Sequence, residues 1–120
     1  MVKKIIITGG LGYIGTELCK IYSGVSWHHK IIVIDNRFIS ERVNQIRNWN
    51  MEFIHGDILD KDLVNKYFKD ADIVHHLAGI TQVPRTKSES NADIDEKITL
   101  VGEKGTQNIL DAISKNCKII

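Results

Sequence analysis

The sequence predicts a three-layer α/β domain whose sheet is mostly parallel and doubly wound. Short runs rich in β-branched residues recur along the chain, and amphipathic helical patterns fill most of the intervals between them. These runs are almost continuously apolar, as expected of strands that helices cover on both faces, whereas strands with one wet face alternate apolar and polar residues. The alternation of strand and helix therefore indicates right-handed crossovers between parallel strands.

A fifth strand begins at Lys118, after four predicted strands at residues 4–8, 30–35, 51–55 and 72–77. The expected sheet order is 3-2-1-4, with the fifth strand just begun. Strands usually run about five or six residues. The end of the sequence at Ile120 therefore predicts a sheet truncated at its fifth strand.

The first helix is expected at residues 13–23, where the helical period places Ile14, Leu18 and Ile21 on one apolar face. Between the second and third strands the pattern is weaker. A short helix around residues 41–47 is our interpretation of that segment.

A further helix is expected at residues 61–69, with Asp60 or Asp62 as its capping residue. Its apolar face consists of Leu63, Val64, Tyr67 and Phe68. The longest helix is expected at residues 91–115. The polar residues 79–90 before it form the longest expected loop, beyond the carboxyl end of a strand, where such sheets bind ligands.

The composition is that of one domain, with 120 residues of which 42% are hydrophobic and 26% charged. A formal net charge of +1 gives no basic excess for nucleic acid or an anionic membrane. The amino-terminal apolar run is too short for a signal peptide, and no run reaches the roughly 18 residues of a membrane span. Cys19 and Cys117 lie far apart without a CxxC motif, which indicates reduced, buried thiols. We therefore expect a cytoplasmic protein.

Residues 8–15 read Thr-Gly-Gly-Leu-Gly-Tyr-Ile-Gly, directly between the first predicted strand and helix. Gly10, Gly12 and Gly15 match GxGxxG, and Asp35 lies 20 residues beyond Gly15 at the end of the second strand. A turn without side chains lets the backbone approach a pyrophosphate, which the N–H groups at the positive helix end stabilise. Gly15 is expected to allow close packing of helix and strand. The pattern predicts a dinucleotide site; the alternative is a tight turn without a ligand.

Asp35 also bears on which dinucleotide is bound. A carboxylate at this position accepts hydrogen bonds from an adenosine ribose and repels a 2′-phosphate, which favours NAD over NADP. Arg37 supports the opposite alternative, because a guanidinium can pair with that phosphate. NAD is the expected cofactor, and NADP is the less favoured one.

Four motifs together point to a family: residues 8–15, Asp35-Asn36-Arg37, Gly56-Asp57-Ile58, and His76-Leu77-Ala78-Gly79. With them the chain resembles the amino-terminal part of the extended short-chain dehydrogenases/reductases, the NAD-dependent epimerase/dehydratase family acting on nucleotide sugars. The resemblance runs over all 120 residues. It implies a single Rossmann-type NAD(P)-binding domain over residues 1–120, with the substrate domain absent.

The resemblance also implies roles for individual residues. The first glycines would hold the pyrophosphate, Asp35 the adenosine ribose and Asp57 the adenine amino group, while the segment from Leu77 onward would pass beside a cofactor ribose. The residues themselves leave a turn-capping role open for Asp57. The expected cofactor-binding set is Gly9, Gly12, Tyr13, Ile14, Gly15, Asp35, Asn36, Arg37, Asp57, Ile58, Leu77, Ala78 and Gly79.

The resembled family transfers hydride with a Ser, a Tyr and a Lys, the last two in a Tyr-x-x-x-Lys motif that this chain lacks. The tyrosine shuttles the substrate proton while the ammonium lowers its pKa, so no catalytic residue is assigned here. Gly102 stands where the family usually has an asparagine of its catalytic constellation. We therefore expect the cofactor-binding portion of a nucleotide-sugar epimerase/dehydratase-like oxidoreductase, inactive alone, with a nucleotide sugar bound only by a longer form.

The alternative function is a non-enzymatic module that senses the cofactor or binds a partner chain. In the resembled family the long helix contributes to a dimer interface, so apolar residues of the helix at 91–115 could drive homodimerisation. A small thiol hydrolase is least favoured, because Cys19 has no identifiable base.

No metal site is expected. His75 and His76 are consecutive on a predicted strand and therefore point to opposite faces of the sheet. Trp27 and Trp49 are expected to be partial core or edge residues, since stacking of bases would need a basic groove.

Overall fold

The computed structural model of the chain describes residues 2–78 and 101–120. One parallel sheet has the order β3-β2-β1-β4-β5, as the sequence predicted. Strands β3 and β4 are slightly shorter than expected. The strands are β1 (Lys4–Thr8), β2 (Lys30–Asp35), β3 (Glu52–His55), β4 (Ile73–His76) and β5 (Lys118–Ile119).

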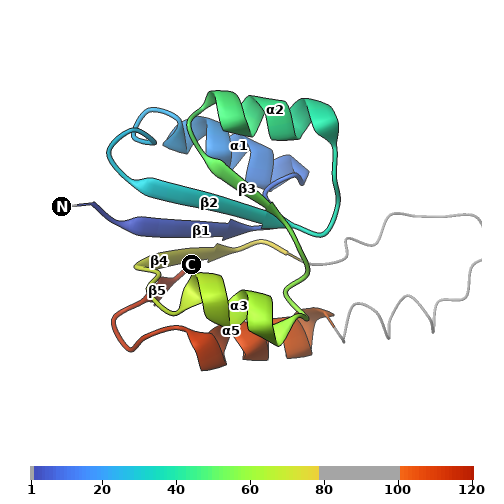
Figure 1. The fold of residues 1–120 in the computed structure, drawn as a ribbon, viewed down its shortest axis with the longest axis vertical. Helices are drawn as coiled ribbons and strands as arrows, with labels where there is room; N and C mark the ends of the chain where they lie inside the picture. Colours follow the sequence, from blue (N-terminus) through green and yellow to red (C-terminus); the bar gives the residue numbers. More distant parts are fainter. Residues whose placement is uncertain (1, 79–100) are drawn as a thin grey trace, which may run out of the picture.

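Helices cover both faces of the sheet (Figure 1). Helices α1 (Tyr13–Tyr22) and α2 (Ser40–Asn48) lie on one face, and α3 (Lys61–Phe68) and α5 (Thr106–Ala112) lie on the other. A short π-helical segment, η1 (Val101–Gly105), leads into α5.

The helix predicted at residues 91–115 ends earlier than expected. Ile113 is already extended, and the polar residues after it turn the chain toward β5. Residues 91–100 lie outside the described part of the chain, as do residues 79–90 of the predicted loop.

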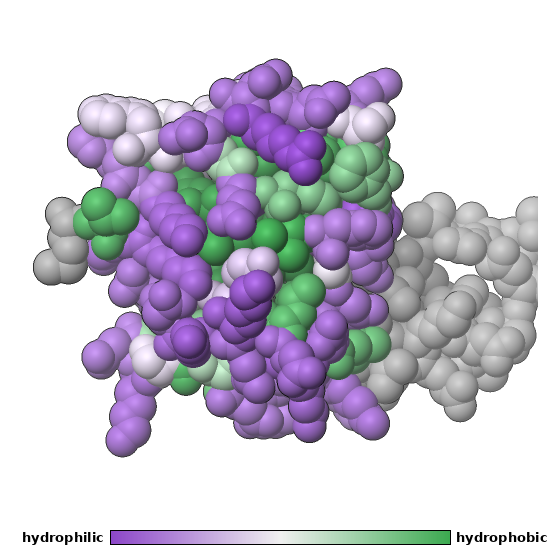
Figure 2. All heavy atoms as spheres, viewed as in Figure 1, coloured by the Kyte–Doolittle hydropathy of each residue, from purple (hydrophilic) through white to green (hydrophobic). Residues whose placement is uncertain are grey.

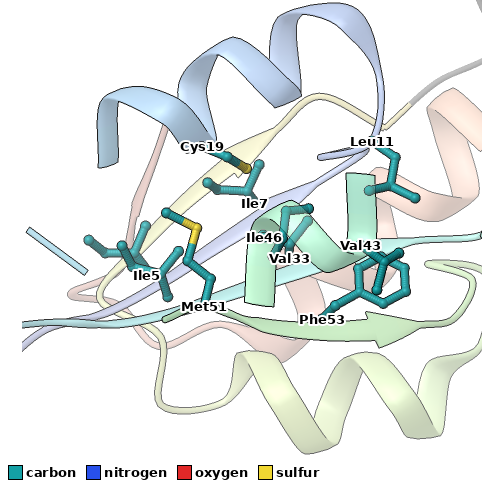
Figure 3. Packing of buried hydrophobic residues seen from close by; sticks show 10 residues of the cluster. Ile5, Ile7, Leu11, Cys19, Val33, Val43, Ile46, Met51 and Phe53 are labelled. Atoms are coloured by element: carbon teal, nitrogen blue, oxygen red, sulfur yellow. The ribbon is translucent and has the colours of Figure 1, made fainter. Parts of the chain in front are cut away.

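The core consists of two layers, one on each side of the sheet. Along β1, Ile5 and Ile7 belong to the cluster beneath α1 and α2, which Figure 3 shows, whereas Ile6 belongs to the cluster that includes Val64 and Phe68 of α3. The apolar residues of β1 therefore pack against helices on both faces of the sheet. This packing on both faces explains the continuous apolar runs of the sequence. The outer surface in Figure 2 is mainly hydrophilic, with apolar residues visible near its centre.

The predicted apolar face of α1 is wrong. Ile14 and Ile21 are 70% and 75% exposed, and the buried residues of the helix are Gly15 and Cys19, with Leu18 only partly buried. A step of about 100° per residue separates the two candidate faces by roughly a quarter turn. The small residues face inward because they let α1 lie close to the glycine-rich turn and the sheet.

The expectations for the cap of α3, the two cysteines and the two tryptophans are confirmed only in part. Asp60 is confirmed as the cap of α3, because its carboxylate accepts hydrogen bonds from the N–H groups of the first turn. Cys19 is buried as predicted, but Cys117 is only partly buried. Trp49 packs at the core edge, whereas Trp27 is 70% exposed and stacks on His28 instead, with ring centroids 3.4 Å apart.

No helix in residues 2–78 and 101–120 has the length and apolar character needed to cross a membrane.

Two glycines of η1 provide a matched test of the packing between α5 and the loop after β3. A Cβ at Gly105 would clash with the side chain of Ile58, whereas a Cβ at Gly102 would meet nothing within 4 Å. Gly105→Ala should lower the free energy of unfolding by about 1–3 kcal/mol through overpacking. Gly102→Ala should change it by less than about 1 kcal/mol, in the stabilising direction. Urea denaturation measures both, and equal effects would contradict this packing.

Candidate functional site

The carboxyl ends of β1, β2 and β4 meet at one edge of the sheet, and the glycine-rich turn lies there. Thr8, the last residue of β1, is in register with Ile34 of β2 and His76 of β4. Directly after it, the Gly9 N–H donates to the carbonyl of Ile34 at 2.8 Å. The turn therefore begins between the ends of two neighbouring strands, where doubly wound sheets bind their ligands.

The turn is packed too closely for side chains. Gly9 has φ of +68°, and a Cβ there would lie 2.8 Å from the Ala78 nitrogen. A Cβ at Gly10 would clash with Val33 of β2, and one at Gly15 would lie 2.5 Å from the Gly9 carbonyl oxygen. The expected packing role of Gly15 is therefore correct in kind, but its partner is the turn itself rather than the strand.

The amino end of α1 opens at this turn. Gly12 is the N-cap and has no side chain to accept from the first N–H groups, and the first turn of the helix holds no acidic residue. Tyr13 and Ile14, 84% and 70% exposed, flank this end. The positive end of the helix is therefore left without a negative side chain of its own first turn.

Asp35 ties the turn to the end of β2. It is 5% exposed, and its Oδ2 accepts from the Leu11 N–H at 3.0 Å. Its Oδ1 accepts from the Arg37 N–H at 2.9 Å and from the Arg37 Nε at 3.4 Å. Arg42 of α2 donates to the Leu11 carbonyl. The backbone of Leu11 is thus held at its N–H by the Asp35 carboxylate and at its carbonyl by the Arg42 guanidinium.

Arg37 and Asn36 line the same edge. The Arg37 side chain is 56% exposed, and its Nη2 lies 3.6 Å from where a Gly12 Cβ would stand. Asn36 is exposed, and its carbonyl lies 3.1 Å from Nε2 of His55. The guanidinium therefore sits beside the turn while it pairs with Asp35.

On the other side of the turn, the segment that follows β4 is anchored to β1. The N–H groups of Leu77 and Ala78 donate to the Thr8 Oγ1 at 3.1 and 3.0 Å. Leu77 is 37% exposed, which leaves it accessible at the edge. Gly79, the last member of the expected set, lies outside the described residues.

Asp57 and Ile58 follow β3 and are used structurally. The exposed Asp57 carboxylate accepts from the Leu59 N–H at 2.9 Å, which is the turn-capping role that the residues left open. Ile58 is 5% exposed and belongs to the core, and its carbonyl accepts from Asn108 Nδ2 at 2.9 Å. The side chain of Ile58 is therefore not free to contact a ligand.

The two histidines of β4 point to opposite faces, as predicted. His75 lies 2.6 Å from the Tyr22 hydroxyl of α1, whereas His76 lies 2.9 Å from the Thr106 hydroxyl of α5. Burial lowers the pKa of both imidazoles. Among residues 2–78 and 101–120, no group of three or more potential metal ligands comes together.

Cys19 is not arranged as a nucleophile. Burial raises the pKa of its thiol to about 12, so the thiol is protonated at neutral pH.

Sequence reasoning missed two features of the site. Arg42 carried no motif, because a charged residue on a helix normally indicates only a solvated face. The hydroxyl of Thr8 was hidden within the glycine motif, although its place at the end of β1 was predicted.

Comparisons with known proteins find similar sequences that align with nearly the whole chain. The family model described as the 3-beta hydroxysteroid dehydrogenase/isomerase family matches residues 6–119. The chain is 37% identical over 129 residues to CDP-paratose 2-epimerase of Salmonella typhi, covering 98% of this chain and 35% of that protein. It is 32% identical over 124 residues to dTDP-D-glucose 4,6-dehydratase of Dictyostelium discoideum, covering 98% and 27%. The chain thus spans about a third of the length of these relatives.

Solved structures share the fold. An epimerase from Methanothermobacter thermautotrophicus superposes with a TM-score of 0.72 at 29% identity, covering 92% of this chain and 31% of that one. A dTDP-glucose 4,6-dehydratase from Streptomyces venezuelae, solved with NAD bound, gives a TM-score of 0.72 at 22% identity, covering 91% and 35%. The latter likeness concerns the fold alone.

Asp35→Ala should destabilise the fold by about 1–3 kcal/mol, because the buried Leu11 N–H loses its acceptor. Asp57→Ala is the matched control. It removes an exposed carboxylate that also accepts a backbone N–H, and should cost about 0.5–1 kcal/mol. Urea denaturation of both variants compares them, and a smaller loss for Asp35→Ala than for the control would contradict the role of Asp35 in holding the turn.

Proposed function

This chain belongs to the 3-beta hydroxysteroid dehydrogenase/isomerase family of extended short-chain dehydrogenases/reductases, the group of the NAD-dependent epimerases and dehydratases, and we propose that it forms their NAD-binding portion. One observation carries the proposal. The glycine-rich turn and the open amino end of α1 lie at the sheet edge between Asp35 and the segment Leu77-Ala78. We further propose that residues 1–120 act as one binding domain.

The residues present suit a dinucleotide. A Cβ at Gly12 would lie 3.2 Å from the Gly9 carbonyl oxygen, so the turn keeps its surface free of side chains. A pyrophosphate can then meet backbone N–H groups and the positive helix end, beside Tyr13 and Ile14. When bound, NAD would accept or return a hydride.

The remaining assignments extend from the turn in both directions. Asp35, with Asn36 and Arg37 next to it, would hold the adenosine ribose, and Asp57 would reach the adenine, with Ile58 contributing through its backbone. Leu77, Ala78 and Gly79 would lie along the other ribose.

NAD is the dinucleotide that the charges favour. The Asp35 carboxylate is buried at the ribose end and would repel a 2′-phosphate, while Arg37 is engaged with that same carboxylate. A guanidinium held by an acid is less available to pair with a phosphate.

The proposed substrate class is a nucleotide sugar, bound by a longer form. The relatives that align with 98% of this chain are named for sugar nucleotides, whereas the family model is named for steroid dehydrogenases. We give the relatives more weight than the name of the family model, because each of them is identical to this chain at about a third of the aligned residues. The chain contains no Tyr-x-x-x-Lys pair, so we propose no turnover by these 120 residues alone.

A thermal-shift titration of the chain with NAD and ADP-ribose tests the proposal. A ligand that binds only the folded state stabilises it by roughly 2.7 kcal/mol at a hundredfold excess over Kd. We expect a rise in Tm with both ligands. Gly12→Ala should weaken it, because a methyl group enters the crowded turn, whereas Gly24→Ala places its Cβ 3.9 Å from its nearest neighbour and should not.

A cooperative transition that no dinucleotide shifts would overturn the binding proposal and leave a folded scaffold without a cofactor. Binding of NAD combined with turnover of a nucleotide sugar by the chain alone would overturn the proposed inactivity. Binding without turnover, in a full-length protein as well, would favour the cofactor-sensing module.

Asp35→Asn should shift the preference toward NADP by on the order of tenfold, measured as the ratio of the two Kd values. The amide oxygen can still accept the Leu11 N–H, but the negative charge is gone and Arg37 is released. Adding Arg37→Gln should remove the gain for NADP. An unchanged ratio in Asp35→Asn would show that Asp35 does not select the cofactor.

A further inference from the structure

A hydrogen-bonded relay crosses the sheet edge beside the proposed site. The Thr8 hydroxyl, fully buried at the end of β1, lies 2.9 Å from Nδ1 of His76. The Nε2 of the same ring lies 2.9 Å from the hydroxyl of Thr106, at the start of α5. The imidazole therefore connects the end of β1 to α5 through two hydroxyl groups.

The contacts of Thr8 decide how the relay is polarised. Its oxygen accepts from the N–H groups of Leu77 and Ala78, which occupies both lone pairs of a hydroxyl. The hydroxyl hydrogen is then the only part left for His76, so Nδ1 is the acceptor. The proton of the neutral ring lies on Nε2 and is donated to Thr106.

We propose that His76 is a positioning residue: as a neutral imidazole protonated on Nε2, it fixes Thr8 and thereby the segment Leu77-Ala78 against the glycine-rich turn. Its consequence for the cofactor rests on the proposed function. Both ring nitrogens are engaged by threonine hydroxyls, so His76 acts through its neighbours.

The segment is placed where small movements reach the turn. A Cβ on Gly9 would lie 2.8 Å from the Ala78 nitrogen and 2.9 Å from the Leu77 carbonyl carbon. The two backbones are therefore in direct contact, and any displacement of Ala78 changes the space beside Gly9.

A second proton on His76 would break the arrangement. Nδ1–H would become a third donor to the Thr8 oxygen, whose lone pairs are already used. Leu77 N–H has the Thr8 carbonyl as a second acceptor at 3.2 Å, whereas Ala78 N–H has no other acceptor among the described residues. When the Thr8 hydroxyl turns to accommodate this donor, Leu77 is still held by the Thr8 carbonyl, whereas Ala78 is held by the hydroxyl alone. Ala78 is therefore the residue expected to shift as the pH falls through the pKa of His76, which burial holds below its usual value.

Among the described residues, the elements packed against His76 bring few charged or titratable groups near its ring. On its own strand, His75 faces the opposite side of the sheet. Directly after β5, the backbone carbonyl of Ile120 accepts the backbone N–H of His76 at 3.3 Å. From η1, Glu103 and Lys104 are exposed. Thr8 of β1 and Thr106 of α5 carry no charge.

Nuclear magnetic resonance of the 120-residue chain tests the relay without any ligand. At neutral pH the ring-nitrogen shifts should give a neutral His76 protonated on Nε2, and the amide signal of Ala78 should titrate together with His76 as the pH falls. In Thr106→Val the preference for Nε2 should weaken, and Thr106→Ser should restore it. A ring protonated on Nδ1, or an Ala78 amide that ignores the titration of His76, would overturn the proposal.

Isothermal titration with ADP-ribose tests the consequence. Affinity in the unaltered chain should fall about fivefold as the pH falls through the pKa of His76, the effect of one hydrogen bond. In His76→Asn, whose amide oxygen can accept from Thr8 but cannot be protonated, the affinity should not depend on pH in this way. His75→Asn is the control on the opposite face and should keep the dependence.

The outcomes separate the two proposals. A pH profile that survives in His76→Asn would overturn the role of His76 while leaving dinucleotide binding intact. A relay with the expected tautomer and a titrating Ala78 amide, but no binding of ADP-ribose at any pH, would support the positioning of Leu77-Ala78 and overturn the proposed function.

Discussion

The hydrogen bond between the buried carboxylate of Asp35 and the Leu11 N–H is the contact on which the candidate site depends. A glycine-rich turn has little side-chain packing of its own, so its shape must come from the strands around it. Asp35, at the end of β2, fixes the shape of the turn by accepting from the Leu11 N–H. Arg42 of α2 fixes it further by donating to the Leu11 carbonyl. The turn is therefore built as an extension of the sheet, and its N–H groups keep their direction before any ligand arrives.

The same logic explains why packing, rather than flexibility, accounts for most of the glycines. Val33 of β2 fills the space that a side chain on Gly10 would need, and the Gly9 carbonyl does the same for Gly15. Gly10 is thus matched to a side chain of β2, and Gly15 to the backbone of the turn. The spacing of the glycines therefore suits the turn only because the sheet and the helices lie at fixed distances from one another. The packing of the two core layers sets those distances.

The sequence was sufficient for the strands, their order and the edge at which the motifs meet, because these follow from local pattern and chain topology. It failed where a decision depends on distant partners. The period of α1 offered an apolar face with Ile14 and Ile21, and only the close approach to the turn selects Gly15 and Cys19 instead. The contacts of Thr8 with His76 and of Arg42 with Leu11 join residues 68 and 31 positions apart, which no short motif records.

Asp35 carries two functions that cannot be changed independently. One carboxylate holds the turn through Leu11 and, in the proposed function, also receives the ribose and excludes a 2′-phosphate. A residue that accepted the phosphate would therefore have to accept the Leu11 N–H as well, or leave it buried without a partner. An uncharged amide meets both demands better than an aliphatic residue. Cofactor preference in this fold is thus constrained by the stability of the turn as well as by the ligand.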